Sequence, residues 1–140
     1  MNAAATWRFR AHMDDLQAAL AAAEAFCAQQ GVDDGDALRL RLVLEELFTN
    51  TVMHGHRGSC DAPVLLALQR TGGQLQLDYA DDAPPFDPRV YLQTASQDPE
   101  IDQDRLGGHG LWLVAEMAER LEHAHDGRFN RLTLVLRGGD

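Results

Sequence analysis

The sequence has few cysteines, few basic residues and no long apolar run. Its 140 residues include two cysteines, Cys27 and Cys60, whose separation does not match a metal-binding pair. No apolar stretch approaches the roughly 20 residues that a membrane-spanning helix needs. Residues 1–10 contain no apolar core of a secretory signal. These absences favour a cytoplasmic protein with reduced thiols and no contact with a membrane.

Basic residues are scarce relative to acidic ones. The chain has 12 Lys and Arg against 22 Asp and Glu, which gives a formal net charge of −10. A surface of that sign repels phosphate backbones, so nonspecific binding of DNA or RNA is disfavoured. Hydrophobic residues make up 45% of the chain, as in an ordinary globular protein. We therefore expect a single domain over residues 1–140, with proteins as its macromolecular partners.

The pattern of apolar residues predicts an α+β fold. Residues 83–106 lack periodicity and contain several prolines, and a loop of this length inside a compact domain is usually functional. The order β-α-α-β-β-loop-α-β-β predicts one mixed, mostly antiparallel sheet with helices packed on one face. Strands are expected at 6–11, 63–70, 74–80, 121–126 and 129–137, and helices at 14–31, 33–54 and 111–121.

The second predicted helix carries two polar residues within its apolar pattern. Glu46 and Asn50 are four residues apart and therefore project from the same side of a helix. An amide oxygen is a suitable ligand for Mg²⁺, and a nearby carboxylate can orient a hydroxyl for attack on phosphorus. A solvated polar face of a helix would contain the same pair. The pair alone leaves both interpretations open.

Directly after the strand at 74–80 comes an acidic, proline-rich segment, residues 81–88 (Asp-Asp-Ala-Pro-Pro-Phe-Asp-Pro). A carboxylate at a strand end can accept a hydrogen bond from the amino group of adenine. Guanine presents a carbonyl there, so two acceptors would face each other and guanine would be rejected. Asp81 is therefore a candidate adenine contact. A turn stiffened by prolines and capped by aspartates is the alternative.

A glycine-rich turn precedes the predicted helix at 111–121, with the sequence Gly107-Gly108-His109-Gly110-Leu111. Glycines let the backbone approach a phosphate closely, and a helix N-terminus offers free N–H groups. No Lys-Ser or Lys-Thr pair follows, so the turn is not a Walker A loop, and the loop before it excludes a Rossmann fingerprint. Such turns also precede helices that bind nothing. Arg105 is either a γ-phosphate contact or a solvated residue of the loop.

In their order and spacing, these segments resemble the motifs of the GHKL ATPase superfamily. Within it they are most similar to the anti-sigma-factor serine-protein kinases of bacterial partner-switching systems. Residues 44–55 (Leu-Glu-Glu-Leu-Phe-Thr-Asn-Thr-Val-Met-His-Gly) resemble the N box, residues 81–88 the G1 box and residues 107–114 the G2 box. The resemblance covers essentially the whole chain. It implies a Bergerat-type α/β sandwich that binds ATP and Mg²⁺.

The resemblance also implies roles for individual residues. Asn50 would coordinate Mg²⁺, Glu46 would be the catalytic base, and Asp81 would contact adenine. Gly108 and Gly110 would border the phosphates. The other implied nucleotide contacts are Ala83, Pro85, Arg105, Gly107, His109, Leu111 and Thr133.

Two of these positions depart from the family pattern. Ala83 and Pro85 occupy G1 positions that often hold glycine, so the backbone beside the base is stiffer here. Thr133, in the last predicted strand, would help to close the adenine side of the pocket.

Chain length separates the members of the superfamily. A sensor histidine kinase needs a helix pair that carries its phosphorylated histidine, and gyrase-like members need a transducer domain. We expect neither in 140 residues. The resemblance then implies a kinase that phosphorylates a serine or threonine of a STAS-domain anti-sigma-factor antagonist. It also implies alternative binding to a sigma factor or equivalent target. Whether the chain forms a homodimer is left open by the sequence. The alternatives are a nucleotide-binding module that only sequesters a partner, and an α+β domain without a nucleotide.

Overall fold

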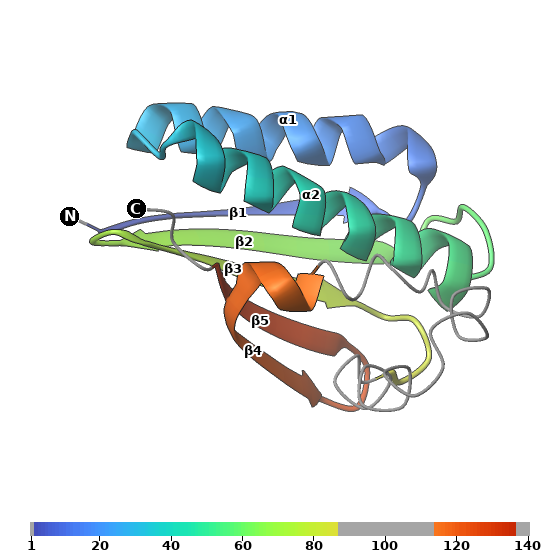
Figure 1. Cartoon of the computed structure of the whole chain (residues 1–140). Helices are drawn as coiled ribbons and strands as arrows, with labels where there is room; N and C mark the ends of the chain where they lie inside the picture. The colour runs from blue at the N-terminus through green and yellow to red at the C-terminus, as the bar shows by residue number, and fades with distance from the viewer. Residues whose placement is uncertain (1, 87–113, 137–140) are drawn as a thin grey trace.

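The computed structural model describes residues 2–86 and 114–136. Its elements are β1 (Asn2–Arg10), α1 (Met13–Gln30), α2 (Asp34–Asn50), a π-helical turn (Thr51–Gly55), β2 (Pro63–Thr71), β3 (Gln74–Asp81), β4 (Ala118–His125) and β5 (Asn130–Leu136). A short helical turn at 114–117 precedes β4. The two long helices pack together above a single sheet (Figure 1).

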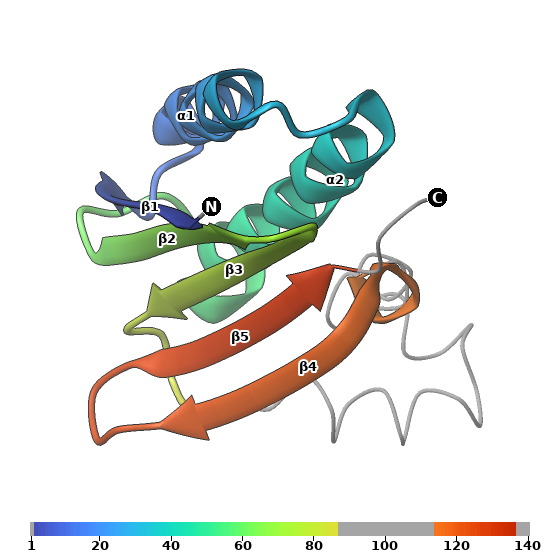
Figure 2. The same cartoon turned by 90° about the vertical axis from the view of Figure 1, so that its left-hand side faces the viewer.

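The described strands form a five-stranded sheet in the order β1-β2-β3-β5-β4. Both long helices lie on the same face of this sheet, which confirms the predicted α+β class and layer arrangement (Figure 2). Every pair of neighbouring strands is antiparallel. The described sheet therefore lacks the parallel pair that a mixed sheet would include. The N-terminal strand β1 lies at one edge of the sheet.

Local signals in the sequence fix the ends of both long helices. His12 caps α1, because its Nδ1 accepts a hydrogen bond from the backbone N–H of Asp14 at 3.1 Å. Gly31 ends α1 with a left-handed backbone, φ 66°, which glycine adopts without steric cost. Asp33 caps α2 by accepting from the N–H of Asp36 at 2.8 Å. The predicted helices at 14–31 and 33–54 are thus confirmed.

The hydrophobic core lies between the helices and the inner face of the sheet. Side chains alternate along each strand, so in β3 Leu75, Leu77 and Tyr79 point to the helices while Asp78 points to the opposite face. The same alternation puts Asp81 on the helix side, two residues after Tyr79. The largest fully buried side chains are Phe48, Leu20, Leu40, Leu44, Leu66, Leu68, Leu77, Leu134, Val43, Val52 and Val64. Burial of each contributes about 1.5–3 kcal/mol.

The predicted helix at 111–121 is wrong at its C-terminal end. Residues 111–113 lie outside the described residues, residues 114–117 are helical, and β4 begins at Ala118. Ala118 pairs with Leu136 and Leu121 with Leu134, with a register shift between 118 and 120. Leu121 packs against the core from this strand. The segment is rich in good helix formers, but pairing with β5 and burial of Leu121 override that local preference.

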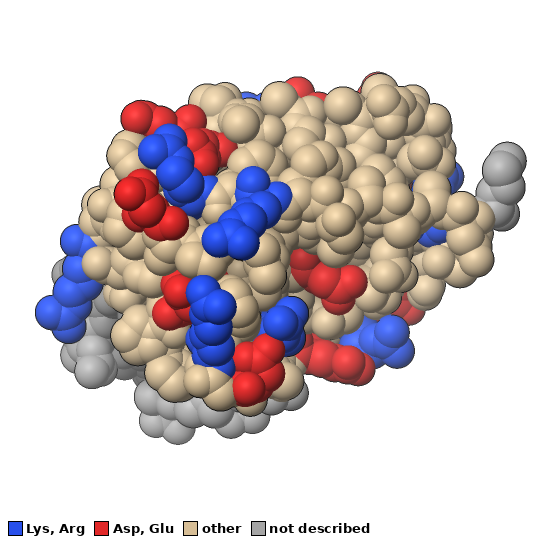
Figure 3. All heavy atoms as spheres, turned by 180° about the vertical axis from the view of Figure 1, so that it is seen from behind, with Lys and Arg blue, Asp and Glu red and all other residues tan. Residues whose placement is uncertain are grey.

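Charged side chains of both signs are interspersed on the face of the molecule opposite to the view of Figure 1 (Figure 3). Several charged side chains of the described residues form close pairs, such as Arg10 with Asp15 at 2.8 Å and Arg131 with Asp126 at 2.6 Å. The described residues form no continuous basic patch on that face, of the kind that nucleic-acid binding requires.

Within residues 2–86 and 114–136, none of the helices combines the length and the apolar character needed to cross a membrane.

Candidate functional site

A cavity of about 270 Å³ lies where the C-terminal end of α2 meets the ends of β3 and β5. Four of the predicted site residues, Asn50, Asp81, Ala83 and Pro85, contribute to its wall. The fold therefore brings the N-box and G1-box segments to the same cavity. The described wall consists of Leu47, Asn50, Thr51, His54, Gly55, Arg57, Tyr79, Asp81, Ala83, Pro84, Pro85, Phe86, His123, Asn130 and Leu132.

Asp81 is the centre of a hydrogen-bond network in this wall. Its Oδ2 accepts from the Thr51 hydroxyl at 2.7 Å. Its Oδ1 accepts from the side-chain amide of Asn130 at 3.0 Å and from the backbone N–H of Ala83 at 3.2 Å. A carboxylate has about four acceptor positions, so the three donors among the described residues leave one free. That position suits a donor on a ligand, such as the amino group of adenine.

Tyr79 supports the network from the core. Its hydroxyl lies 2.6 Å from the Thr51 hydroxyl, and either can be the donor of this contact. The Thr51 hydroxyl has the Asp81 carboxylate and, at 3.0 Å, the Leu47 carbonyl oxygen as acceptors, and the Tyr79 hydroxyl lies 3.3 Å from the same carbonyl oxygen. Burial, reinforced by the charge of Asp81, raises the pKa of Tyr79 well above its usual range. The phenol therefore remains protonated and can donate to Thr51 or to the Leu47 carbonyl oxygen.

Asn130 holds the segment after β3 in place. Its Nδ2 donates to Asp81 and to the carbonyl oxygens of Ala83 at 3.0 Å and Pro84 at 3.1 Å. Its Oδ1 accepts from the backbone N–H of Phe86 at 2.9 Å. The sequence analysis missed this residue. The available signal was its phase, since a polar residue two positions before the buried Leu132 must face the helix side of β5.

Thr133 is not brought to the cavity. It is one residue out of phase with Leu132, so it lies on the opposite face of the sheet, where its hydroxyl donates to Asp78 at 2.9 Å. In the described structure Asn130 and Leu132 are the residues of β5 that reach the cavity wall.

Asn50 lines the cavity with a polar atom that has no partner. Its Nδ2 is buried and makes no hydrogen bond among the described residues. Leaving such an atom unsatisfied costs free energy, so it is expected to meet a ligand. Rotation of the amide exchanges its oxygen and nitrogen, and the same position therefore suits an oxygen ligand to Mg²⁺. The described residues contain no cluster of three or more His, Cys, Asp or Glu that could hold a metal ion alone. The donor set fits an ion held by one protein oxygen and by phosphates.

Glu46 lies one helical turn before Asn50, half-buried on α2 and outside the described cavity wall. Burial raises the pKa of Glu46, and the charge of the neighbouring Glu45 raises it further. A carboxylate whose pKa lies closer to neutrality is a more effective proton acceptor. Its position and its pKa are therefore compatible with a base at the edge of the site.

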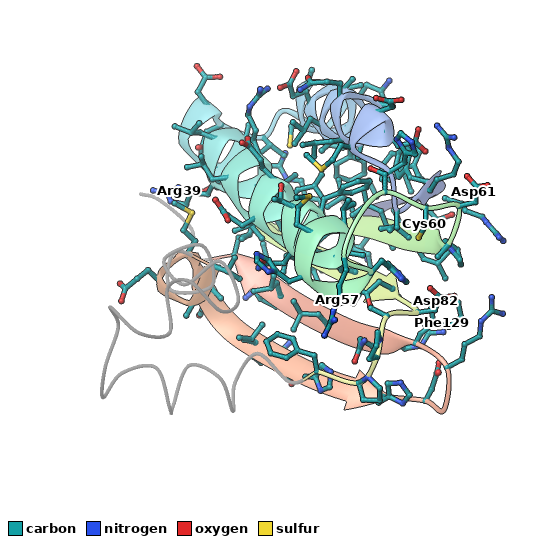
Figure 4. All side chains as sticks on the ribbon, turned by 90° about the vertical axis from the view of Figure 1, so that its right-hand side faces the viewer. Arg39, Arg57, Cys60, Asp61, Asp82 and Phe129 are labelled. Carbon is teal, nitrogen blue, oxygen red and sulfur yellow. The ribbon has the colours of Figure 1, made fainter. Side chains whose placement is uncertain are left out.

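Asp82 connects the site to the neighbouring turns. Its Oδ1 lies 3.4 Å from Nε2 of His56 and its Oδ2 lies 3.9 Å from the guanidinium of Arg128. Arg128 also lies over the ring of Phe129, 4.7 Å from its centre. Figure 4 shows Asp82 and Phe129 on the same side of the molecule, near the turn between β4 and β5. Asp81 and Asp82 thus differ in their surroundings. Asp81 lines the cavity, whereas Asp82 contacts the turns that contain His56 and Arg128.

The remaining predicted contacts, Arg105, Gly107, Gly108, His109, Gly110 and Leu111, lie outside the described residues.

Gly55 and Ala83 are in close contact at the back of the cavity. A Cβ built on Gly55 would lie 2.8 Å from the Cβ of Ala83, which is closer than non-bonded carbon atoms approach each other. We expect Gly55→Ala to destabilise the fold by about 1–3 kcal/mol, measured by urea denaturation, because one of the two segments must move. The double variant Gly55→Ala/Ala83→Gly removes the clash and should recover most of that loss. If the double variant is no more stable than the single one, the steric explanation is wrong.

The sequence matches the histidine kinase-like ATPase domain family over residues 9–136. The protein therefore belongs to this family, and the resemblance based on the N box and G1 box is confirmed at that level. The chain is 30% identical over 96 residues to the serine/threonine-protein kinase BtrW of Bordetella bronchiseptica, which covers 69% of this chain and 67% of that protein. The structure is similar to a chain of the SiaB-SiaC complex from Pseudomonas aeruginosa, with a TM-score of 0.69 and 14% identity. That alignment covers 94% of this chain and 88% of the other, and it bears on the fold.

Proposed function

We propose that the protein is an ATP-dependent serine/threonine protein kinase that phosphorylates a STAS-domain antagonist and alternatively binds a sigma factor or equivalent target. The observation that carries the proposal is the cavity itself. It combines Asp81, with one free acceptor position, and Asn50, with one unsatisfied amide atom, in a member of an ATPase family. The similarity to BtrW, which is described as a serine/threonine-protein kinase, supports phosphoryl transfer to a protein hydroxyl.

Each residue has a defined part in the proposed reaction. Asp81 accepts a hydrogen bond from the amino group of adenine and would oppose the carbonyl of guanine. Asn50 would hold Mg²⁺, which when bound offsets the charge of the triphosphate. Glu46 takes the proton of the incoming serine or threonine hydroxyl while the γ-phosphoryl group passes to that oxygen and ADP leaves.

The proposal is tested by supplying Mg-ATP and a STAS-domain protein encoded beside this one in its genome. We expect one phosphoserine or phosphothreonine on that protein, detected by mass spectrometry, and about 100-fold slower phosphorylation when the Glu46→Gln variant replaces the parent. ATP and GTP binding are measured in parallel by calorimetry, and ATP should bind more tightly. Equal binding of the two nucleotides would contradict the role of Asp81, and phosphorylation by Glu46→Gln at the parent rate would contradict the role of Glu46.

The second candidate is a nucleotide-binding module that acts only by sequestering a protein partner. It is favoured by the position of Glu46 outside the described cavity wall. In that case the protein binds ATP and its partner but phosphorylates nothing, and the nucleotide changes only the affinity for the partner.

A further inference from the structure

Arg57 has an unusual backbone conformation at the rim of the cavity. It follows the π-helical turn that ends α2, and its φ is 59°, in the left-handed region. Among the described residues it is the one non-glycine residue with a positive φ. A side chain with a Cβ disfavours this conformation, and such strain, like a π-helical turn, is often found at binding sites. The strained backbone holds the Arg57 side chain at the cavity, whose wall it helps to form.

The guanidinium of Arg57 has no partner in the described structure. Most other arginines there are paired with a carboxylate or a carbonyl oxygen, namely Arg10, Arg39, Arg41, Arg70, Arg120, Arg128 and Arg131. Arg8, on the outer face of β1, is the other arginine without one. Figure 4 places Arg57 beneath the end of α2, on the side that faces the sheet. Arg57 is exposed, and an unpaired cation in the wall of a cavity is available for an anionic group.

The charges of the wall indicate which part of a nucleotide that group is. Asp81 contributes a negative charge beside the predicted base position, so it repels phosphates. In the described wall Arg57 is the permanently cationic side chain, and it comes from the same segment of chain as Asn50. The phosphates are therefore expected on the Arg57 side of the cavity, where a guanidinium can donate two hydrogen bonds to one phosphate group.

We propose that Arg57 binds the polyphosphate of the nucleotide, an inference that rests on the proposed function. The test compares Arg57→Gln with the parent protein by calorimetry, using adenosine, ADP and ATP as separate ligands. We expect ATP affinity to fall about tenfold or more and adenosine affinity to stay within about twofold, because adenosine has no phosphate. Arg8→Gln, which removes the same charge away from the cavity, should leave all three affinities unchanged.

The outcomes separate this inference from the function on which it rests. If the parent protein binds neither ATP nor adenosine, the proposed function fails. If the parent protein binds both and Arg57→Gln binds ATP equally well, only the role of Arg57 fails. Equal losses for adenosine and ATP would also overturn it, since they would place the guanidinium at the base instead of at the phosphates.

A second variant separates phosphate binding from a structural role. Glycine adopts a positive φ without steric cost, so Arg57→Gly should raise the midpoint of thermal unfolding. It should lower the affinity for ATP as much as Arg57→Gln does. Stability and affinity would then change in opposite directions. A variant that loses both thermal stability and ATP affinity would indicate that Arg57 only maintains the fold, and the inference would be wrong.

Discussion

Glu46→Gln is expected to slow phosphoryl transfer about 100-fold or more while ATP affinity stays within about twofold, because the variant loses only a proton acceptor. Glutamine keeps the shape of glutamate, but it replaces one acceptor oxygen with a donor NH2 group and cannot take the proton of the incoming hydroxyl. Glu46 lies outside the described cavity wall, so the substitution should not change the contacts that bind ATP. Single-turnover transfer from Mg-ATP to the STAS-domain protein measures the rate, and calorimetry measures the affinity. An unchanged transfer rate would remove Glu46 from the mechanism.

The pH dependence of transfer gives an independent check on the same residue. Burial and the charge of Glu45 raise the pKa of Glu46, and the reaction needs the unprotonated carboxylate. The transfer rate should therefore fall as the pH drops through a pKa that lies above that of an ordinary glutamate.

Glu45→Gln is the matched control for the pH profile, because it removes a neighbouring charge and leaves Glu46 in place. The fall in rate should then occur at a lower pH, with the same rate at the plateau. A plateau rate that drops as far as in Glu46→Gln would show that the reaction needs Glu45 as much as Glu46 and would contradict the assignment.

Asp81→Asn is expected to weaken ATP binding by about 1.5–3 kcal/mol, the contribution of a hydrogen bond to a charged group. The substitution places an amide among the three donors from Thr51, Asn130 and Ala83 that now meet carboxylate oxygens. It therefore removes the acceptor for adenine and disturbs the segment beside it. Calorimetric titration with ATP and with GTP measures the effect, and the preference for ATP should decrease.

Asp78→Asn is the matched control for this variant. Asp78 is on the same strand but on the opposite face, where it accepts from Thr133 at 2.9 Å. Its substitution should leave ATP affinity unchanged. If Asp78→Asn lowers the affinity for ATP as much as Asp81→Asn does, the loss comes from a disturbed sheet and not from a lost contact with adenine.

Much of the fold could be predicted from the sequence because its signals are local. The caps at His12 and Asp33, the glycine at 31 and the alternation of the strands lie within a few residues of the elements they define. Residues 118–121 show the limit of such signals. Their composition favours a helix, and only pairing with β5, formed later in the chain, makes them a strand.

The site shows the same division between local and distant information. Asn50, Asp81, Ala83 and Pro85 belong to short motifs, and the fold gathers them at one cavity. Asn130 has no motif, since its role depends on the carboxylate of Asp81, 49 residues earlier in the chain. Thr133 was chosen by its place in the last strand, but in a strand a shift of one residue moves a side chain to the other face.

The contact between Gly55 and Ala83 also bears on how the two motifs can vary. Ala83 stands where the family often has glycine, and its methyl group occupies the space that a side chain at position 55 would need. The two positions thus share one volume that holds a single methyl group. A related sequence could have alanine at 55 and glycine at 83. Alanine at both positions would force the end of the helix away from the end of the strand. Residues 55 and 83 should therefore covary among related sequences, although they belong to different motifs.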